Sequence, residues 1–208
     1  MKIRKTSTGF TIIELMVATT VFSVILVIVT FGLIQIGRVY NRGITNSRTQ
    51  EVARGIMDEV TQSVQFNGGT VQSISHGSSG TIGYCIGARR YSVRLGRMFT
   101  ETPGDHGLIT DTLPGTCSPT TQAVDLSLSD ISTASSYPQE LLLPNMRVSN
   151  LSITPLSNNL YSVNLKVAYG FDDLLNSPTS TNPTCKDGLG RQFCTILSLD
   201  TVVQKRVE

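Results

Sequence analysis

The chain has 208 residues, with 17 basic and 15 acidic side chains, four cysteines and two histidines. Such a nearly balanced charge excludes the strongly basic composition that is typical of general nucleic-acid-binding proteins. About 140 residues follow a long N-terminal apolar segment, which is enough for one globular domain with a real hydrophobic core.

The N-terminus is short and basic and leads into a long uncharged segment. Lys2, Arg4 and Lys5 precede the apolar residues, and without these three cations 14 basic side chains face 15 acidic ones, for a net charge of −1. Residues 15–37 carry no charge over 23 positions. As a helix they extend about 34 Å, against roughly 30 Å for the hydrocarbon core of a bilayer. This segment is therefore predicted to cross a membrane once.

Glu14 is anomalous because it lies at the start of this apolar block. An ionised side chain inside a bilayer costs about 3 kcal/mol even after local relaxation, so we expect the carboxylate to have a specific partner. A conventional secretory signal is the alternative interpretation. It would have a shorter apolar core without a glutamate and a small-residue cleavage site after it, and no A-x-A pattern follows here.

The sequence G-F-T-I-I-E-L at residues 9–15 resembles the class III signal of type IV pilins and the related pseudopilins. The resemblance implies that a prepilin peptidase removes a cytoplasmic leader, residues 1–9, after Gly9. Phe10 then becomes the N-terminus and is N-methylated, and Glu14 accepts the charge of the Phe10 amine of a neighbouring subunit. It also implies other pilin subunits and an inner-membrane assembly platform as partners.

A single long helix is predicted after the leader. Residues 10–66 contain no proline, and Asn67-Gly68-Gly69 provides a stop signal. The transmembrane and filament-core half covers residues 10–37, and the amphipathic half covers residues 38–66. The apolar side chains of the second half recur at helical spacing and are predicted to pack on the globular domain: Ala53, Ile56, Met57, Val60 and Val64.

Beyond Gly69 the pattern changes to that of a β-rich domain, residues 70–208. The stretch 100–138 is rich in Pro, Gly, Ser and Thr, and we expect loops there with one or two short strands, of which 124–128 has the clearest pattern. Asn158-Asn159 is predicted to be a hairpin turn. The remaining predicted strands are 70–75, 81–86, 90–95, 140–143, 146–153, 160–169 and 195–206. The predicted fold class is α+β, pilin-like by resemblance, with the helix packed on an antiparallel sheet.

All four cysteines follow the apolar segment, which fits an oxidising compartment where an even set can pair: Cys85, Cys117, Cys185 and Cys194. Three pairings are open. The resemblance favours Cys185 with Cys194, because many pilins carry a disulfide-bounded loop before the last strand, and this loop contains Gly188 and Gly190 for a tight closure. Cys85 and Cys117 would then form the second bridge.

One basic cluster stands out in the globular part, accompanied by the aromatic residues Tyr91 and Phe99: Arg89, Arg90, Arg94 and Arg97. These side chains could contact DNA phosphates or a surface ligand. On one strand, however, Arg90 and Arg94 would share a face while Arg89 and Arg97 would lie on the other. A solvated or ion-paired strand is therefore the favoured interpretation.

The residues available for catalysis or metal binding are few. His76 and His106 lie in predicted loops and are interpreted as surface histidines. Asp172, Asp173 and Asp187 could supply oxygen ligands to calcium, but they lack a dense alternating carboxylate pattern, so a solvated loop is favoured. We expect no catalytic site, no metal and no cofactor.

The functional prediction is a structural subunit of a type IV pilus. It would be a single-pass protein of the inner membrane before assembly and would then reside in an extracellular pilus or a periplasmic pseudopilus. The long helix with its R-x-x-E-x-x-R run at residues 48–54, and the large domain with extended loops, favour a minor, tip-associated subunit. The alternatives are a type II secretion pseudopilin, or a pilus-borne adhesin or DNA-binding subunit. A membrane-anchored enzyme would need a pocket that the sequence does not show.

Overall fold

The computed structural model describes residues 9–77, 79–101, 105–118, 120–126, 138–157 and 159–206. The chain divides into two compact units, Met1–Asn41 and Arg42–Glu208. One helix, α1 (Ile12–Phe66), has 55 residues and contributes to both units. The predicted long helix is therefore confirmed, with its start two residues later than expected.

In the first unit, the side chains of α1 are exposed almost throughout. Within the described part of the chain, α1 is the one helix that is long and apolar enough to cross a membrane. The hydroxyl groups of Thr19, Thr20, Ser23 and Thr30 each donate a hydrogen bond to a backbone carbonyl three or four residues earlier. These polar groups are therefore satisfied inside the helix, as a lipid environment requires.

In the second unit, α1 buries one stripe of side chains, as the periodicity predicts. All five expected apolar residues of this stripe are buried. The stripe also extends toward the N-terminus through Thr45 and Thr49, which are buried within a stretch that is otherwise polar. Thr49 donates its hydroxyl hydrogen to the carbonyl of Thr45 at 2.8 Å, which makes this burial tolerable.

The chain after α1 first forms a five-stranded antiparallel sheet in sequence order. Its strands are β1 (Val71–His76), β2 (Thr81–Ile86), β3 (Arg89–Val93), β4 (Leu108–Thr112) and β5 (Gln139–Glu140). The first two strands lie where the sequence predicts them. The third ends at Val93, before the predicted end, and β5 has two residues where four were expected.

The stretch 100–138 holds β4, but not where a strand was expected. Val124 and Leu126 are buried without belonging to a strand, and residues 127–128 lie outside the described part. The segment lies on the sheet through hydrogen bonds to side chains: Val124 N–H donates to Ser92 Oγ at 2.9 Å. In its described part, 124–126, the segment predicted at 124–128 is therefore not a strand, because sheet side chains replace a neighbouring strand as hydrogen-bond partners.

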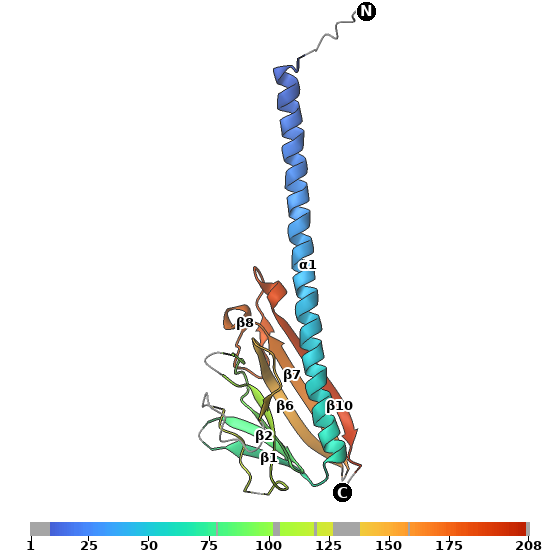
Figure 1. Ribbon diagram of the computed structural model, residues 1–208, viewed down its shortest axis with the longest axis vertical. Coiled ribbons are helices and arrows are strands. Elements are labelled where there is room, and N and C mark those ends of the chain that lie inside the picture. The colour runs from blue at the N-terminus through green and yellow to red at the C-terminus, as the bar shows by residue number, and fades with distance from the viewer. Residues whose placement is uncertain are drawn as a thin grey trace, which may run out of the picture. The chain divides into compact units, whose positions relative to one another are not determined.

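A three-stranded antiparallel sheet with the order β10-β7-β6 completes the main architecture. Its strands are β6 (Met146–Ser157), β7 (Leu160–Tyr169) and β10 (Thr195–Gln204), and they run side by side along the C-terminal part of α1 (Figure 1). The central strand β7 buries Tyr161, Val163, Leu165 and Val167 on one face, as its alternation predicts. Of the predicted Asn158-Asn159 turn, Asn158 lies outside the described residues.

Short elements occupy the connection between β7 and β10. These are the 3-10 turns η1 (Asp172–Leu174) and η2 (Arg191–Phe193) and the two-stranded sheet of β8 (Leu175–Asn176) and β9 (Thr184–Cys185). The disulfide Cys185–Cys194 closes the loop between β9 and β10. The second disulfide, Cys85–Cys117, ties β2 to the segment after β4. Both are the pairs that the sequence analysis favours.

One hydrophobic cluster joins the buried stripe of α1 to both larger sheets, including Val60, Tyr91 and Val163. A polar contact is embedded in it, because Ser63 Oγ lies 2.6 Å from Tyr91 Oη. At the other end of the chain, Arg206 N–H donates to the carbonyl of Gln65 at 3.1 Å. The structure is thus a pilin-like α+β architecture, one long helix on antiparallel sheets with two disulfides.

Candidate functional site at the start of the long helix

Thr11 and Glu14 form a reciprocal pair at the first turn of α1. The backbone N–H of Thr11 donates to Glu14 Oε2 at 2.9 Å, and the Thr11 hydroxyl donates to the same oxygen at 2.8 Å. In return, the N–H of Glu14 donates to Thr11 Oγ1 at 3.3 Å. This is the capping box of a helix N-terminus, T-x-x-E, which satisfies two backbone donors that the helix itself leaves unpaired.

The capping box gives Glu14 a partner within the chain, in addition to the amine expected from a neighbouring subunit. Thr11 supplies a local partner, and the positive end of the helix dipole favours a negative charge in the first turn. Both contacts use Oε2, and no described residue donates a hydrogen bond to Oε1. Glu14 therefore has a structural role within the chain while one of its oxygens remains open to an external donor.

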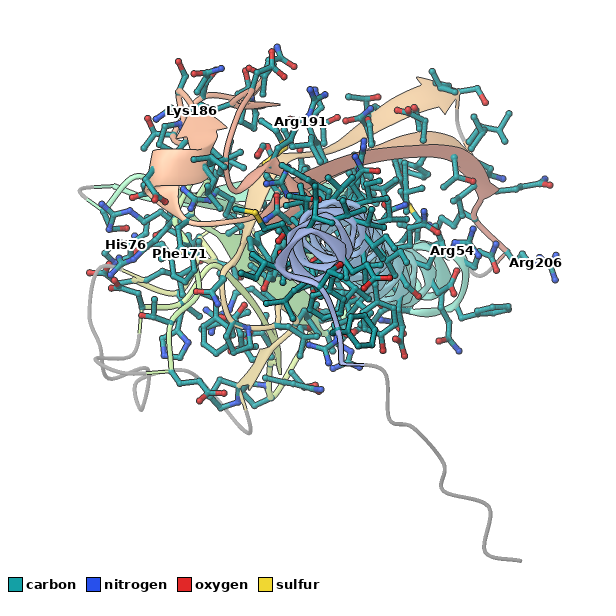
Figure 2. The ribbon with its side chains drawn as sticks, turned by 90° about the horizontal axis from the view of Figure 1, so that it is seen from above. Arg54, His76, Phe171, Lys186, Arg191 and Arg206 are labelled. Carbon is teal, nitrogen blue, oxygen red and sulfur yellow. A yellow bond between two sulfur atoms is a disulfide. The ribbon has the colours of Figure 1, made fainter. Side chains whose placement is uncertain are left out.

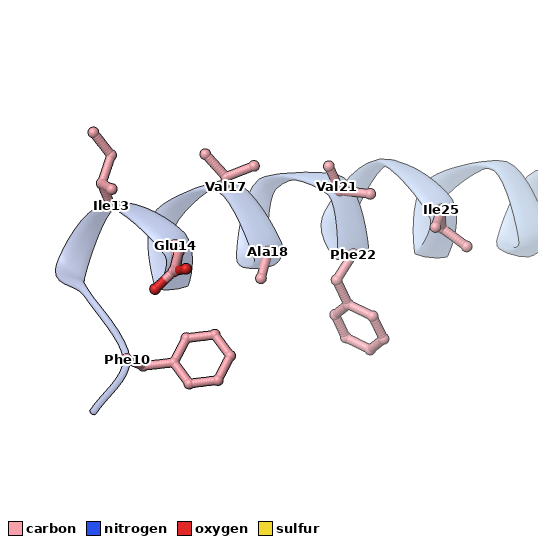
Figure 3. A pocket seen from close by; sticks show the side chains of 8 residues that line it. All are labelled: Phe10, Ile13, Glu14, Val17, Ala18, Val21, Phe22 and Ile25. Carbon is pink, nitrogen blue, oxygen red and sulfur yellow. The ribbon is translucent and has the colours of Figure 1, made fainter. Parts of the chain in front are cut away.

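An open apolar groove of about 670 Å³ begins beside Glu14 and continues along the helix. In Figure 3 the rings of Phe10 and Phe22 extend on the side of the helix where Glu14 and Ala18 lie, so that small Ala18 separates two large side chains. The groove is lined by Phe10, Ile13, Glu14, Val17, Ala18, Val21, Phe22 and Ile25. Glu14 is the one charged residue in this lining.

The groove is strongly exposed, since 82% of Phe10 and 61% of Phe22 are accessible to solvent. A continuous apolar surface of this kind is stable only when lipid or other protein covers it. The helix length and the distribution of its hydroxyl groups fit both environments. The first unit is therefore built for contact with a membrane or with other helices.

Gly9 and Phe10 precede the first turn, and both are exposed. A Cβ atom added at Gly9 would meet no atom of the described residues within 4 Å. Packing inside the chain thus gives no reason for glycine at this position. An accessible peptide bond between a residue without a side chain and an aromatic residue fits recognition by a processing enzyme.

The four arginines of the predicted basic cluster do not form one surface. Arg94 and Arg97 follow β3 instead of lying on it, so the expected division between two faces of a strand is wrong for this pair. Arg90 donates to both carboxylate oxygens of the buried Asp111, from Nε at 2.9 Å and from Nη2 at 2.5 Å. Its remaining Nη1 donates to the carbonyl of Gln122 at 2.9 Å. Arg90 thus holds a loop onto the sheet.

The other arginines have separate surroundings. Arg89 Nη2 lies 3.6 Å from Glu59 Oε1 on α1. Arg97 pairs with Asp105 and donates to the carbonyl of Leu126 at 2.5 Å. Within the described part of the chain, Arg94 forms no ion pair, and it lines a pocket together with Arg97. Three of the four arginines therefore hold structural contacts.

His106 is not the surface residue that the sequence suggests. Only 16% of its side chain is exposed, its ring stacks on Phe99 with centroids 6.1 Å apart, and its Nδ1 lies 3.3 Å from Glu140 Oε2. Glu140 also accepts the backbone N–H groups of Gly107 at 3.1 Å and Leu108 at 2.9 Å. Burial raises the pKa of the Glu140 carboxyl despite these donors.

The remaining candidate side chains are also engaged locally. His76 lies partly exposed, with Nδ1 3.2 Å from Ser79 Oγ. Asp172 pairs with the buried Arg147 at 2.6 Å, and Asp187 pairs with Arg191. Among the residues that the structure describes, no three His, Cys, Asp or Glu side chains gather closely enough to hold a metal ion.

Residues 4–30 match the family model described as the prokaryotic N-terminal methylation motif. A search of curated proteins and a search of solved structures each gave no match. The matched region contains Gly9, Phe10, Thr11, Glu14 and most of the apolar groove. Together with the fold, the motif indicates a type IV pilin-like or pseudopilin precursor and implies processing by a prepilin peptidase and assembly with other pilins.

Proposed function

We propose that this protein is a minor, tip-associated structural subunit of a type IV pilus, cut after Gly9 and assembled through the first half of α1. The observation that carries the proposal is the exposed groove beginning at Phe10, with Glu14 at its rim, inside the matched methylation motif. A type II secretion pseudopilin would use the same site. Counting this subunit against the others in purified filaments by mass spectrometry separates a minor from a major role.

The membrane segment can leave the bilayer at little cost if other helices replace the lipid. Residues 15–37 have no charged group, and their four hydroxyls are bonded within the helix. Association of such helices depends on close packing, not on exclusion of water. Small Ala18 between the rings of Phe10 and Phe22 offers a recess that a side chain of a neighbouring helix can fill.

Glu14 then has two partners in the assembled state. Its Oε2 stays in the capping box with Thr11, and its Oε1 accepts the N-terminal amine of Phe10 from a neighbouring subunit. At about 4 Å and an effective dielectric constant near 20, such a pair of charges attracts with about 4 kcal/mol before desolvation. That energy is large enough to select one register of helix against helix, and both charges are neutralised inside an apolar filament core.

We also propose that the globular domain has no catalytic role. The polar side chains that enzyme chemistry would need are engaged in structural pairs, among them Arg90 with Asp111 and His106 with Glu140. In a filament, such a domain would form part of the outer surface. Contact with DNA or with a surface ligand would be a further property of that outer surface.

Three substitutions separate the two roles of Glu14. Glutamine is accepted at the third position of a capping box, so Glu14→Gln keeps the cap and removes the charge. Thr11→Ala removes the cap, at about 1 kcal/mol, and keeps the charge. Glu14→Ala removes both. Incorporation is measured as the amount of subunit in sheared, purified filaments relative to the amount in the membrane fraction.

We expect Glu14→Gln and Glu14→Ala to lose incorporation to a similar, large extent, and Thr11→Ala to retain most of it. All three variants should reach the membrane at normal levels, because residues 15–37 are unchanged. Normal incorporation of Glu14→Gln would show that Glu14 acts only through the cap. Loss of membrane insertion in the variants would contradict the assignment of the apolar segment.

A further inference from the structure

The loop between Cys185 and Cys194 presents a large apolar side chain to solvent. Leu189 at its tip is 91% exposed and lies between Gly188 and Gly190, whose φ angles are 116° and 93°. A Cβ atom at Gly190 would lie 2.8 Å from Leu174 Cδ2, so the loop is seated closely against η1. The disulfide and the two glycines thus hold Leu189 outward on a fixed support.

Two further apolar side chains lie at the same end of the sheet. Phe193 is 43% exposed and Phe171 is 53% exposed. Gly170, directly before Phe171, is so close to the loop that a Cβ atom there would lie 3.3 Å from the carbonyl oxygen of Phe193. Leu189, Phe171 and Phe193 are thus three exposed apolar side chains of the connection between β7 and β10.

Cations also belong to this connection or lie beside it. Arg191 and Lys186 belong to the loop, and in Figure 2 both appear on the same side of the view, away from Arg54 and Arg206. Arg191 also lines a polar pocket of about 270 Å³ with Arg42 and Asn46 of α1. Asp187 pairs with Arg191, Asp172 pairs with the buried Arg147, and Asp173 lies two positions after Phe171. The four cations Arg42, Arg147, Lys186 and Arg191 and these three carboxylates leave a local net charge of 4 − 3 = +1.

The position of Arg42 in the chain indicates what this surface meets. It follows Gly37, the last residue of the uncharged run, by five positions, which is about 7.5 Å of helix. The polar headgroup layer on each side of a bilayer is about 5–8 Å thick. When residues 15–37 span the membrane, Arg42 is therefore at the level of the headgroups.

We propose that this surface, made of Arg42, Phe171, Lys186, Leu189, Arg191 and Phe193, binds anionic phospholipid headgroups while the subunit is anchored in the membrane. The guanidinium and ammonium groups contact lipid phosphates, and Leu189 with the two phenylalanines enters the interfacial layer, the combination that membrane-surface segments use. The inference rests on anchorage by residues 15–37 and is independent of the role in a filament.

This contact orients the globular domain on the bilayer before assembly. Incorporation into a filament would release it, because the lipid surface is left behind when the helix is extracted.

The absence of tryptophan from the chain makes the test direct. Full-length protein carrying Leu189→Trp is reconstituted into lipid nanodiscs of phosphatidylcholine alone or of phosphatidylcholine mixed with phosphatidylglycerol, with and without brominated acyl chains as quencher. Leu156→Trp is the matched control. Leu156 is also exposed, at 60%, and lies at the opposite end of the strands, because Pro155 pairs with Tyr161 whereas Met146 pairs with Tyr169.

We expect the fluorescence of Leu189→Trp to be quenched at least about twofold more than that of Leu156→Trp in discs with phosphatidylglycerol, and less in phosphatidylcholine alone. Adding Arg42→Gln and Arg191→Gln should bring the quenching down to the control level, and so should high salt. Equal quenching at the two positions would overturn the proposal, and so would quenching at Leu189→Trp that is the same in both lipids. Co-elution of protein with the discs tests the anchorage separately.

Discussion

Ionisation of Tyr91 tests how the helix is held on the sheets. Its side chain is fully buried, and its hydroxyl lies 2.6 Å from Ser63 Oγ and 3.4 Å from the carbonyl oxygen of Glu59, both on α1. Burial raises the pKa of Tyr91 from 10 to about 12, against the opposing effect of the Ser63 hydrogen bond. The folded state therefore holds the phenolic proton more tightly than the unfolded state does.

The raised pKa fixes the sign and the size of the pH effect. The stabilisation is fully present below pH 10 and is lost as the pH rises through 12, because over this range the unfolded state releases the proton first. Two pKa units correspond to about 2.7 kcal/mol, of which about 1.4 kcal/mol is lost by about pH 11. We expect this loss in the free energy of unfolding of the full-length chain in detergent, measured by urea titration and circular dichroism.

Tyr91→Phe isolates this contribution from the other groups that titrate in alkali. The variant leaves the Ser63 hydroxyl without this partner and should be about 1 kcal/mol less stable than the wild type near pH 8. Because phenylalanine cannot ionise, the difference in the free energy of unfolding between wild type and variant should shrink to about zero near pH 11 and then reverse. A difference that stays constant from pH 8 to pH 11 would refute the buried, protonated state of Tyr91.

Two further predictions concern the second unit. Arg147 is buried and donates to the carbonyl of Gly170 at 2.9 Å, so Arg147→Ala should lower the free energy of unfolding by about 3 kcal/mol. Asp172, which pairs with Arg147, has a side chain that is 69% exposed, so Asp172→Asn should lower the free energy of unfolding by less than about 1 kcal/mol. Equal effects of the two variants in urea titrations would contradict this assignment. Replacing both Cys185 and Cys194 by serine should lower the free energy of unfolding by at most about 3 kcal/mol and leave the protein folded. Complete unfolding of the domain, seen by circular dichroism, would contradict this prediction.

The long helix could be predicted from the sequence because its signals are local. The absence of proline, the Asn67-Gly68-Gly69 stop and the buried stripe at helical spacing all lie within the segment that they describe. The capping box is likewise local, because its pattern T-x-x-E lies at residues 11–14.

The strand β4 shows why part of the sheet could not be predicted. Four of its five residues are buried, so the alternation of a half-exposed strand is absent, and one of them is Asp111. Its carboxylate is tolerated there because Arg90 on β3 holds both oxygens. That compensation comes from a residue about 20 positions away, which no local pattern can report.

Polar residues inside the second unit also depend on partners that are distant in the sequence. Arg147 is stabilised by the carbonyls of Gly96 and Gly170, and the loop residue His106 by Phe99 and Glu140. These partners are brought together only by the tertiary fold. The candidate site at residues 9–14 could be located from the sequence because it is one short continuous segment, whereas the amine expected to meet Glu14 belongs to another molecule.

The most direct measurement for the account is the mass of the mature N-terminal peptide, taken from protein isolated from filaments and from membranes. We predict that the mature chain begins at Phe10, that the Phe10 amine carries a methyl group, and that Gly9→Val leaves the precursor uncut in the membrane. Any other mature N-terminus would contradict the assignment of residues 9–14, and so would an intact leader on assembled subunits.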